Sequence, residues 1–262
     1  MTEYDGHDPG TFCWIELSTS DQLGATAFYS NLFGWEAEET PIPPDGIYTM
    51  FRMRGRYVAA AASQREDERA QGVPPHWNTY VASDDADQTA KAAEAAGGTV
   101  LAPPFDVLEA GRMTVLQDPT GAVISAWQAR SHPGFGLAGE PGSFSWPELW
   151  TPDPDRAGAF YGEVFGWTTS AFDMGGAGTY TIFNHGERRV AGMSAPQPGM
   201  EIPPNWLIYL EAADTDATVA TAEQNGGRTL MAPMSMEGAG RFGTLADPQG
   251  AAFGIVTTQN SA

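Results

Sequence analysis

Apolar residues recur at helical spacing in two stretches of the chain. In each stretch they stand at positions i, i+3, i+4, i+7 and i+8: Ala25, Phe28, Tyr29, Leu32 and Phe33, and then Ala157, Phe160, Tyr161, Val164 and Phe165. This spacing lines one face of an amphipathic helix. Ser20-Asp21 offers an N-cap to the first helix, and Gly34 and Gly166 can adopt the left-handed conformation that ends a helix. The pattern therefore predicts the same helix twice.

Short runs rich in β-branched and aromatic residues flank the first helix and predict strands. In the first half of the chain they cover residues 12–17, 35–38, 48–53, 58–62, 77–81, 99–102, 113–117 and 122–127. A second, alanine-rich helix is predicted between an N-cap at Asp84 and the pair Gly97-Gly98. The order of elements is βαβββ twice, and the second half of the chain repeats it.

The repetition extends to individual residues. The run from Phe12 to Leu17 (FCWIEL) returns from Phe144 to Leu149 (FSWPEL), and Trp77 has its counterpart in Trp206. A unit of this length is too long for a solenoid repeat, so we predict two homologous domains, at residues 8–129 and 143–258. Residues 130–142 are rich in Gly and Pro without an apolar period, which is typical of a linker. Sites in the two domains should be related by an approximate two-fold axis.

The charge and cysteine content of the chain indicate which kinds of partner and which compartment to expect. The formal net charge is −20, which disfavours binding to nucleic acid or to an anionic membrane surface. The one cysteine, Cys13, allows no internal disulfide, so a reducing compartment is expected. The N-terminus has no basic region followed by an apolar core, and no apolar run has the length of a membrane span. We expect a cytoplasmic protein, either a monomer with pseudo-two-fold symmetry or a weak homo-oligomer, whose partner is a small organic molecule.

Several duplicated motifs resemble those of the vicinal oxygen chelate superfamily, which includes glyoxalase I, bleomycin-resistance proteins, fosfomycin-resistance enzymes and extradiol dioxygenases. The motifs are the Phe-Gly-Trp helix ends, the Gly-Gly pairs, the Gly-Arg pairs and the Asp-Pro-x-Gly turns. They stand at Phe33-Gly34-Trp35 and Phe165-Gly166-Trp167, Gly97-Gly98 and Gly226-Gly227, Gly111-Arg112 and Gly240-Arg241, and Asp118-Pro119-Thr120-Gly121 and Asp247-Pro248-Gln249-Gly250. The resemblance implies an α+β fold in which each pair of βαβββ modules forms a curved, barrel-like mixed sheet. It also implies a small-molecule site on the concave face, where many members hold a divalent metal.

The sequence departs from the superfamily at its metal ligands. Aligned on the motifs, the ligand positions hold Trp14 and Trp146 in the first strand, Asn78 and Leu207 in the fifth, Ser125 and Gly254 in the eighth, and residues 60–62 and 192–194 in the fourth. Tryptophan, leucine and glycine side chains do not bind divalent ions. His7, His76, His132 and His185 are interpreted as surface or turn histidines. We therefore expect no metal and no cofactor.

Strand alternation and the resemblance instead place an aromatic set with a few polar groups on the concave faces. The candidate ligand-binding residues are Trp14, Glu16, Asn78, Tyr80, Arg112, Ser125, Trp127, Trp146, Glu148, Trp150, Tyr209 and Arg241. Such a set suits a planar or cationic organic ligand. Two structural alternatives stay open: Glu16 and Glu148 could form ion pairs with Arg112 or Arg241, and the tryptophans could fill the core. No catalytic residue is assigned.

Three classes of function are compatible with these residues. The first is a protein that sequesters a small organic compound without metal. The second is a lyase, isomerase or oxygenase of the glyoxalase or dioxygenase kind that uses a non-standard metal site or none. The third is a scaffold or regulatory protein with a vestigial pocket. We favour clefts that exchange halves between the domains, with Trp146 and Glu148 beside Asn78 and Tyr80 in the functional one.

Overall fold

The computed structural model describes all residues except 1, 43–45, 174–178, 197–198, 200–201 and 260–262. The N-terminal sheet has the strand order β3-β4-β5-β2-β6-β9-β8-β7. Its strands are β2 (Phe12–Thr19), β3 (Glu36–Ile42), β4 (Gly46–Met53), β5 (Arg56–Ser63), β6 (His76–Ala82), β7 (Thr99–Val107), β8 (Gly111–Gln117) and β9 (Val123–Ala129). Within it, β2 runs parallel to β5 and antiparallel to β6.

The C-terminal sheet repeats this order as β12-β13-β14-β11-β15-β18-β17-β16. Its strands are β11 (Phe144–Trp150), β12 (Thr168–Asp173), β13 (Thr179–His185), β14 (Arg188–Ser194), β15 (Asn205–Glu211), β16 (Arg228–Met236), β17 (Gly240–Ala246) and β18 (Ala252–Thr257). Two short strands, β1 (Thr2–Glu3) and β10 (Leu137–Ala138), extend it at β11. The predicted α+β fold with two repeated domains is confirmed, and both sheets are open rather than closed barrels.

The predicted pair of helices is also confirmed. Helix α1 (Gln22–Phe33) begins after Asp21, whose carboxylate accepts from Gly24 N, and ends at Gly34 with φ 69°. Helix α4 (Pro154–Phe165) ends in the same way at Gly166 with φ 71°. The alanine-rich helix α3 (Ala86–Ala95) starts one residue later than predicted, because Asp85 rather than Asp84 caps it.

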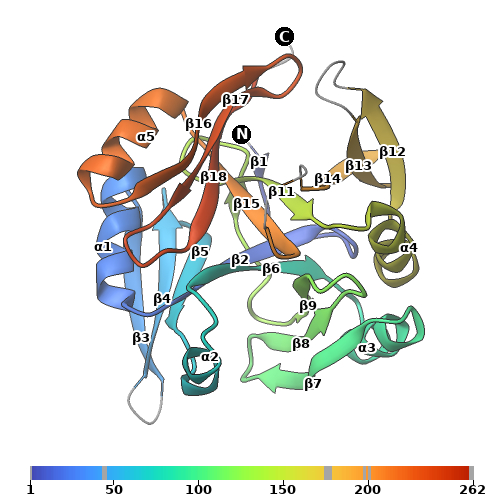
Figure 1. Cartoon of the computed structure of the whole chain (residues 1–262). Helices are drawn as coiled ribbons and strands as arrows, with labels where there is room; N and C mark the ends of the chain where they lie inside the picture. The colour runs from blue at the N-terminus through green and yellow to red at the C-terminus, as the bar shows by residue number, and fades with distance from the viewer. Residues whose placement is uncertain (1, 43–45, 174–178, 197–198, 200–201, 260–262) are drawn as a thin grey trace.

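The sequence did not predict helix α2 (Glu66–Ala70), whose five residues are too few to show a helical period. Helix α5 (Thr215–Gln224) is the C-terminal counterpart of α3. Figure 1 shows α1 beside α5 and α3 beside α4, so each pair joins a helix of one domain to a helix of the other. None of the helices in the described ranges is both long and apolar enough to span a membrane.

The domains pack against each other through their helix-covered faces. The hydroxyl of Tyr29 on α1 donates to Asp247 of the C-terminal domain at 3.1 Å, and that of Tyr161 on α4 donates to Asp118 of the N-terminal domain at 2.9 Å. Trp77 and Trp206 donate to the same two hydroxyls at 3.1 and 2.9 Å. The Asp-Pro-x-Gly turns of one domain therefore hold the first helix of the other.

The predicted linker is packed against the protein along much of its length. Phe135 and Leu137 are buried, and β10 pairs with β1 and β11. The Phe135 amide donates to Cys13 O, and the Gly136 amide donates to Tyr57 O, both at 2.8 Å. These contacts fix how the chain passes from one sheet to the other.

Candidate functional site

The faces of the two sheets that point away from the helices carry most of the candidate residues, and each face is built within one domain. In the N-terminal sheet, Trp14 pairs with Tyr80 and Glu16 with Asn78 across β2 and β6. The expectation that the clefts exchange halves is therefore wrong, and Trp146 does not lie in a cleft with Asn78. Instead, the first helix of each domain packs against the other domain, where Tyr29 donates to Asp247 and Tyr161 donates to Asp118.

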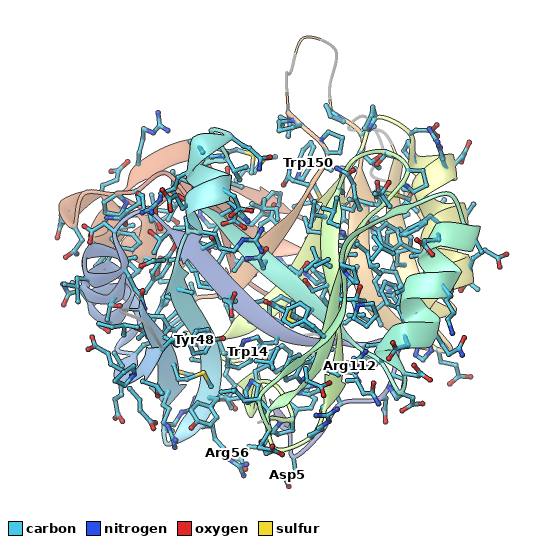
Figure 2. All side chains as sticks on the ribbon, turned by 90° about the horizontal axis from the view of Figure 1, so that it is seen from below. Asp5, Trp14, Tyr48, Arg56, Arg112 and Trp150 are labelled. Carbon is cyan, nitrogen blue, oxygen red and sulfur yellow. The ribbon has the colours of Figure 1, made fainter. Side chains whose placement is uncertain are left out.

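We call the first group of side chains the N-terminal cluster: Trp14, Glu16, Tyr48, Asn78, Tyr80, Ser125 and Trp127. Its carboxylate is well satisfied, because Glu16 accepts hydrogen bonds from Tyr48 at 2.5 Å and from Tyr80 at 3.3 Å. Burial raises the pKa of Glu16, and the two phenol donors oppose that rise. Figure 2 shows Trp14 and Tyr48 side by side in this part of the molecule.

His132 of the linker closes one end of the N-terminal cluster. Its ring stands edge-on to Trp14, with centroids 4.6 Å apart, and its carbonyl accepts from the Trp127 indole at 3.0 Å. Burial lowers the pKa of His132 to about 4, so the imidazole is neutral at physiological pH. Its interpretation as a surface histidine is wrong, since aromatic rings surround it. His7 is also packed, with its Nε2 2.9 Å from Phe135 O.

The second group, the C-terminal cluster, consists of Trp146, Glu148, Trp150, Tyr180, Leu207, Tyr209, Phe242 and Val256. Glu148 is only 8% exposed and accepts from Tyr180 at 2.9 Å, while Trp146 Nε1 donates to the same hydroxyl at 3.1 Å. Burial raises the pKa of Glu148 to about 7, against the smaller opposing effect of the Tyr180 bond. Among the described residues, no Lys, Arg or His forms an ion pair with it. Trp150 lies well away from Trp14 and Tyr48 (Figure 2).

Two glycines of the C-terminal sheet stand where the N-terminal sheet has residues with a side chain. A Cβ on Gly254 would stand 2.2 Å from Tyr209 Cδ1, so the Tyr209 ring lies directly over β18. The matched residue in the N-terminal domain is Ser125, and there Tyr80 reaches Glu16 instead. A Cβ on Gly192 would likewise stand 1.6 Å from the Tyr180 hydroxyl, where the N-terminal domain has Ala60. Tyr48 and Tyr180 nevertheless bond to their glutamates in both clusters, so the difference in phenol donors lies at Tyr80 and Tyr209.

The structure places two predicted site residues elsewhere. Arg112 forms ion pairs with Asp87 of α3 at 2.7 Å and with Asp106 at 2.9 Å. Arg241 pairs with Asp216 of α5 in the same way. Both guanidinium groups therefore lie on the helix side of their sheets. Glu16 and Glu148 do not form the ion pairs considered for them with these arginines. Their carboxylates accept hydrogen bonds from tyrosine hydroxyls instead.

The superfamily's metal does not fit these residues. The positions aligned with the superfamily's metal ligands lie on neighbouring strands of each sheet. They hold Trp14, Asn78, Ser125 and Ala60 in the N-terminal sheet, and Trp146, Leu207, Gly254 and Gly192 in the C-terminal sheet. Neither set provides several nitrogen or oxygen ligands. Within the described ranges, no three His, Cys, Asp or Glu side chains come together in a metal-binding arrangement. Burial also raises the pKa of Cys13, which keeps its thiol protonated.

Sequence reasoning missed Tyr48 and Tyr180, the residues that bond to the two glutamates. Tyr48 lies on a strand that the pattern predicted, and Tyr180 occupies the matched position in the second copy. A tyrosine retained at the same place in both domains was a usable signal. What the pattern could not show is that β4 brings Tyr48 across β5 to Glu16.

The sequence model of one protein family, the Glyoxalase/Bleomycin resistance protein/Dioxygenase superfamily, matches residues 11–125 and 143–255. The chain belongs to this superfamily. It is 41% identical to the protein named "Putative glyoxylase CFP32" from Mycobacterium tuberculosis (strain CDC 1551 / Oshkosh), over 98% of both chains. It is 35% identical to "Anthracycline biosynthesis protein DnrV" from Streptomyces peucetius, over 95% of this chain and 93% of that one.

Solved structures of low sequence identity share the fold. The Mn(II)-bound glyoxalase from Novosphingobium aromaticivorans superposes with a TM-score of 0.64 at 16% identity, over 95% of this chain and 82% of that one. The 2,3-dioxygenase LapB from Pseudomonas sp. KL28 gives a TM-score of 0.65 at 12% identity, over 94% and 91% of the two chains. At these identities the likeness establishes the architecture only.

Proposed function

We propose that this protein binds a small organic cation with an aromatic or apolar body at the C-terminal cluster. The observation that carries the proposal is the environment of Glu148. Its carboxylate is buried among tryptophan and tyrosine side chains, and its one described side-chain hydrogen bond comes from Tyr180. An ionised carboxylate in such surroundings is costly unless a cation pairs with it.

The apolar residues of the cluster suit the body of such a ligand. Leu207, Tyr209 and Val256 are buried, and the partly buried rings of Trp146 and Trp150 pack against them. Aromatic faces attract organic ammonium groups by cation–π interactions, which adds to the attraction of the carboxylate. The relative named for anthracycline biosynthesis is consistent with a small organic molecule as the ligand.

The N-terminal cluster provides an internal comparison. It contains the same tryptophan and glutamate, but Glu16 already accepts two phenol hydrogen bonds and His132 closes one end. A ligand would have to displace these groups. We therefore assign the ligand to Glu148 and not to Glu16.

One observation favours catalysis as a second candidate function. A carboxyl group whose pKa is about 7 can both accept and donate a proton at neutral pH, which is what a general acid–base catalyst requires. On this alternative, Glu148 moves a proton on the bound molecule in a lyase or isomerase reaction of the glyoxalase kind. The relative named as a glyoxylase supports this class.

The test is a calorimetric titration with benzyltrimethylammonium, a permanent cation attached to an aromatic ring, with benzyl alcohol as the neutral comparison. The proposal predicts saturable binding of the cation and much weaker binding of the alcohol. Glu148→Gln should reduce the affinity about tenfold or more, because it removes the negative charge that attracts the quaternary ammonium. Two unit charges about 4 Å apart attract by about 4 kcal/mol at an effective dielectric constant of about 20. Equal affinity for the cation and the alcohol would contradict the proposal.

A further inference from the structure

A cavity of about 140 Å³ lies where the N-terminal segment, the linker and the C-terminal sheet meet. Its lining includes Tyr4, Phe135, Ser145, Trp146, Arg188 and Arg189. The two arginines begin β14, and Ser145 and Trp146 belong to the part of β11 that precedes its pairing with β14 at Glu148. A space of this size has room for several water molecules or for one carboxylate or phosphate group.

The same place in the N-terminal domain is filled by protein. The residues matched to Ser145, Trp146 and Arg189 are Cys13, Trp14 and Tyr57. There the linker bonds to Cys13 O and Tyr57 O, and His132 packs on Trp14. In the C-terminal domain the corresponding region is hollow. The two-fold repeat is therefore broken at this point. Arg189 replaces Tyr57, while Arg188 matches Arg56, which pairs with Glu3 and Asp5 in the N-terminal domain.

The charges at this cavity are unusual for a protein with a net charge of −20. Within the described part of the chain, no carboxylate forms an ion pair with Arg188 or Arg189. The hydrogen bond described for the Arg188 side chain goes to the Tyr4 hydroxyl, at 3.3 Å, and the positive charge of Arg188 contributes to lowering the pKa of nearby His7. No acidic side chain is among the residues that line the cavity. By contrast, Arg52, Arg56 and Arg112 each pair with carboxylates.

We infer that this cavity binds the oxyanion of a small organic carboxylate or phosphate, with Arg188 and Arg189 as the cationic partners. The apolar rings of Phe135 and Trp146 would contact the remainder of the molecule. Guanidinium groups suit this role because their donors match the geometry of carboxylate and phosphate oxygens. The site shares Trp146 with the C-terminal cluster but does not use Glu148, so its charged partners differ from those of the cation site proposed above.

Calorimetric titration with benzoate and with inorganic phosphate, at pH 8 and constant ionic strength, tests the inference. We expect saturable binding of at least one of them, with one site per chain, and benzoate tighter than phosphate if the aromatic lining contributes. Arg189→Gln and Arg188→Gln should each weaken binding about tenfold or more. Arg228→Gln is the matched control, because this exposed arginine of β16 is not among the residues lining the cavity, and it should leave the affinity unchanged.

Two further results decide the matter. Glu148→Gln should retain oxyanion binding, which separates this site from the one proposed for the cation. If neither anion binds saturably, or if Arg188→Gln, Arg189→Gln and Arg228→Gln weaken binding equally, the cavity is not an oxyanion site. In the latter case the anions respond only to the overall charge of the protein.

Discussion

The ring of Tyr209 occupies the space in which a side chain on Gly254 would begin, with Cδ1 only 2.2 Å from the ideal Cβ position. In the other domain Ser125 fills that place, and Tyr80 instead donates to Glu16. Among the described residues, two phenols donate to Glu16 and one donates to Glu148. Gly254 therefore explains why the Glu148 carboxylate can still bind a ligand. The missing side chain at Gly254 thus adds to the other differences between the clusters, which include Leu207 in place of Asn78 and Val256 in place of Trp127.

Gly254→Ser should move the C-terminal cluster toward the N-terminal one. The new side chain must displace the Tyr209 ring, and such overpacking typically costs about 1–3 kcal/mol of unfolding free energy. If the phenol moves onto Glu148, the variant should also bind benzyltrimethylammonium several-fold more weakly. Urea denaturation and calorimetry provide the two measurements. The matched control is Ser125→Gly, and a larger loss of cation binding in Ser125→Gly than in Gly254→Ser would contradict this explanation.

The repeat, the helices with their glycine ends and the α+β fold could be predicted from the sequence because they depend on local periodicity and on residues such as Asp21 and Gly34. The pairing of β2 with β6 could not, since both the exchanged and the within-domain arrangement satisfy the same alternation. The partners of Glu16 also depend on long-range geometry, with Tyr48 lying on the strand beyond β5. Arg112 was assigned to the wrong face because its partner Asp87 comes from a helix far away in the sequence.

The tyrosines that join the domains should contribute to stability in equal measure. Tyr161 accepts from Trp206 and donates to Asp118, and Tyr29 has the matched partners Trp77 and Asp247. Removing either hydroxyl leaves a buried indole N–H and a carboxylate oxygen without their partner, at a cost of about 1–3 kcal/mol. We therefore expect Tyr161→Phe and Tyr29→Phe each to lower the unfolding free energy by this amount. Tyr57→Phe, at a residue outside this interface, is the control, and a loss as large there would show that the hydroxyls do not tie the domains together.

The pH dependence of stability should reveal the buried Glu148. Its pKa is raised from 4.5 to about 7, so between these values the folded protein holds a proton that the unfolded chain has released. Stability should therefore fall as pH rises through this window, by on the order of 3 kcal/mol at most. Glu148→Gln removes the titration, so its unfolding free energy relative to wild type should increase between pH 5 and pH 8. A difference between the two proteins that does not change with pH would mean that Glu148 titrates normally.

The central claim is that the carboxylate of Glu148, and not that of Glu16, binds an organic cation. The most direct measurement is the affinity for benzyltrimethylammonium in wild type, Glu148→Gln and Glu16→Gln at pH 6 and pH 8. The proposal predicts that wild type binds more tightly at pH 8, because Glu148 ionises as pH passes its pKa of about 7. It also predicts that Glu148→Gln loses both this pH dependence and, with the loss of the negative charge, about tenfold or more in affinity, while Glu16→Gln resembles wild type. Equal losses in the two variants, or tighter binding at pH 6, would contradict it.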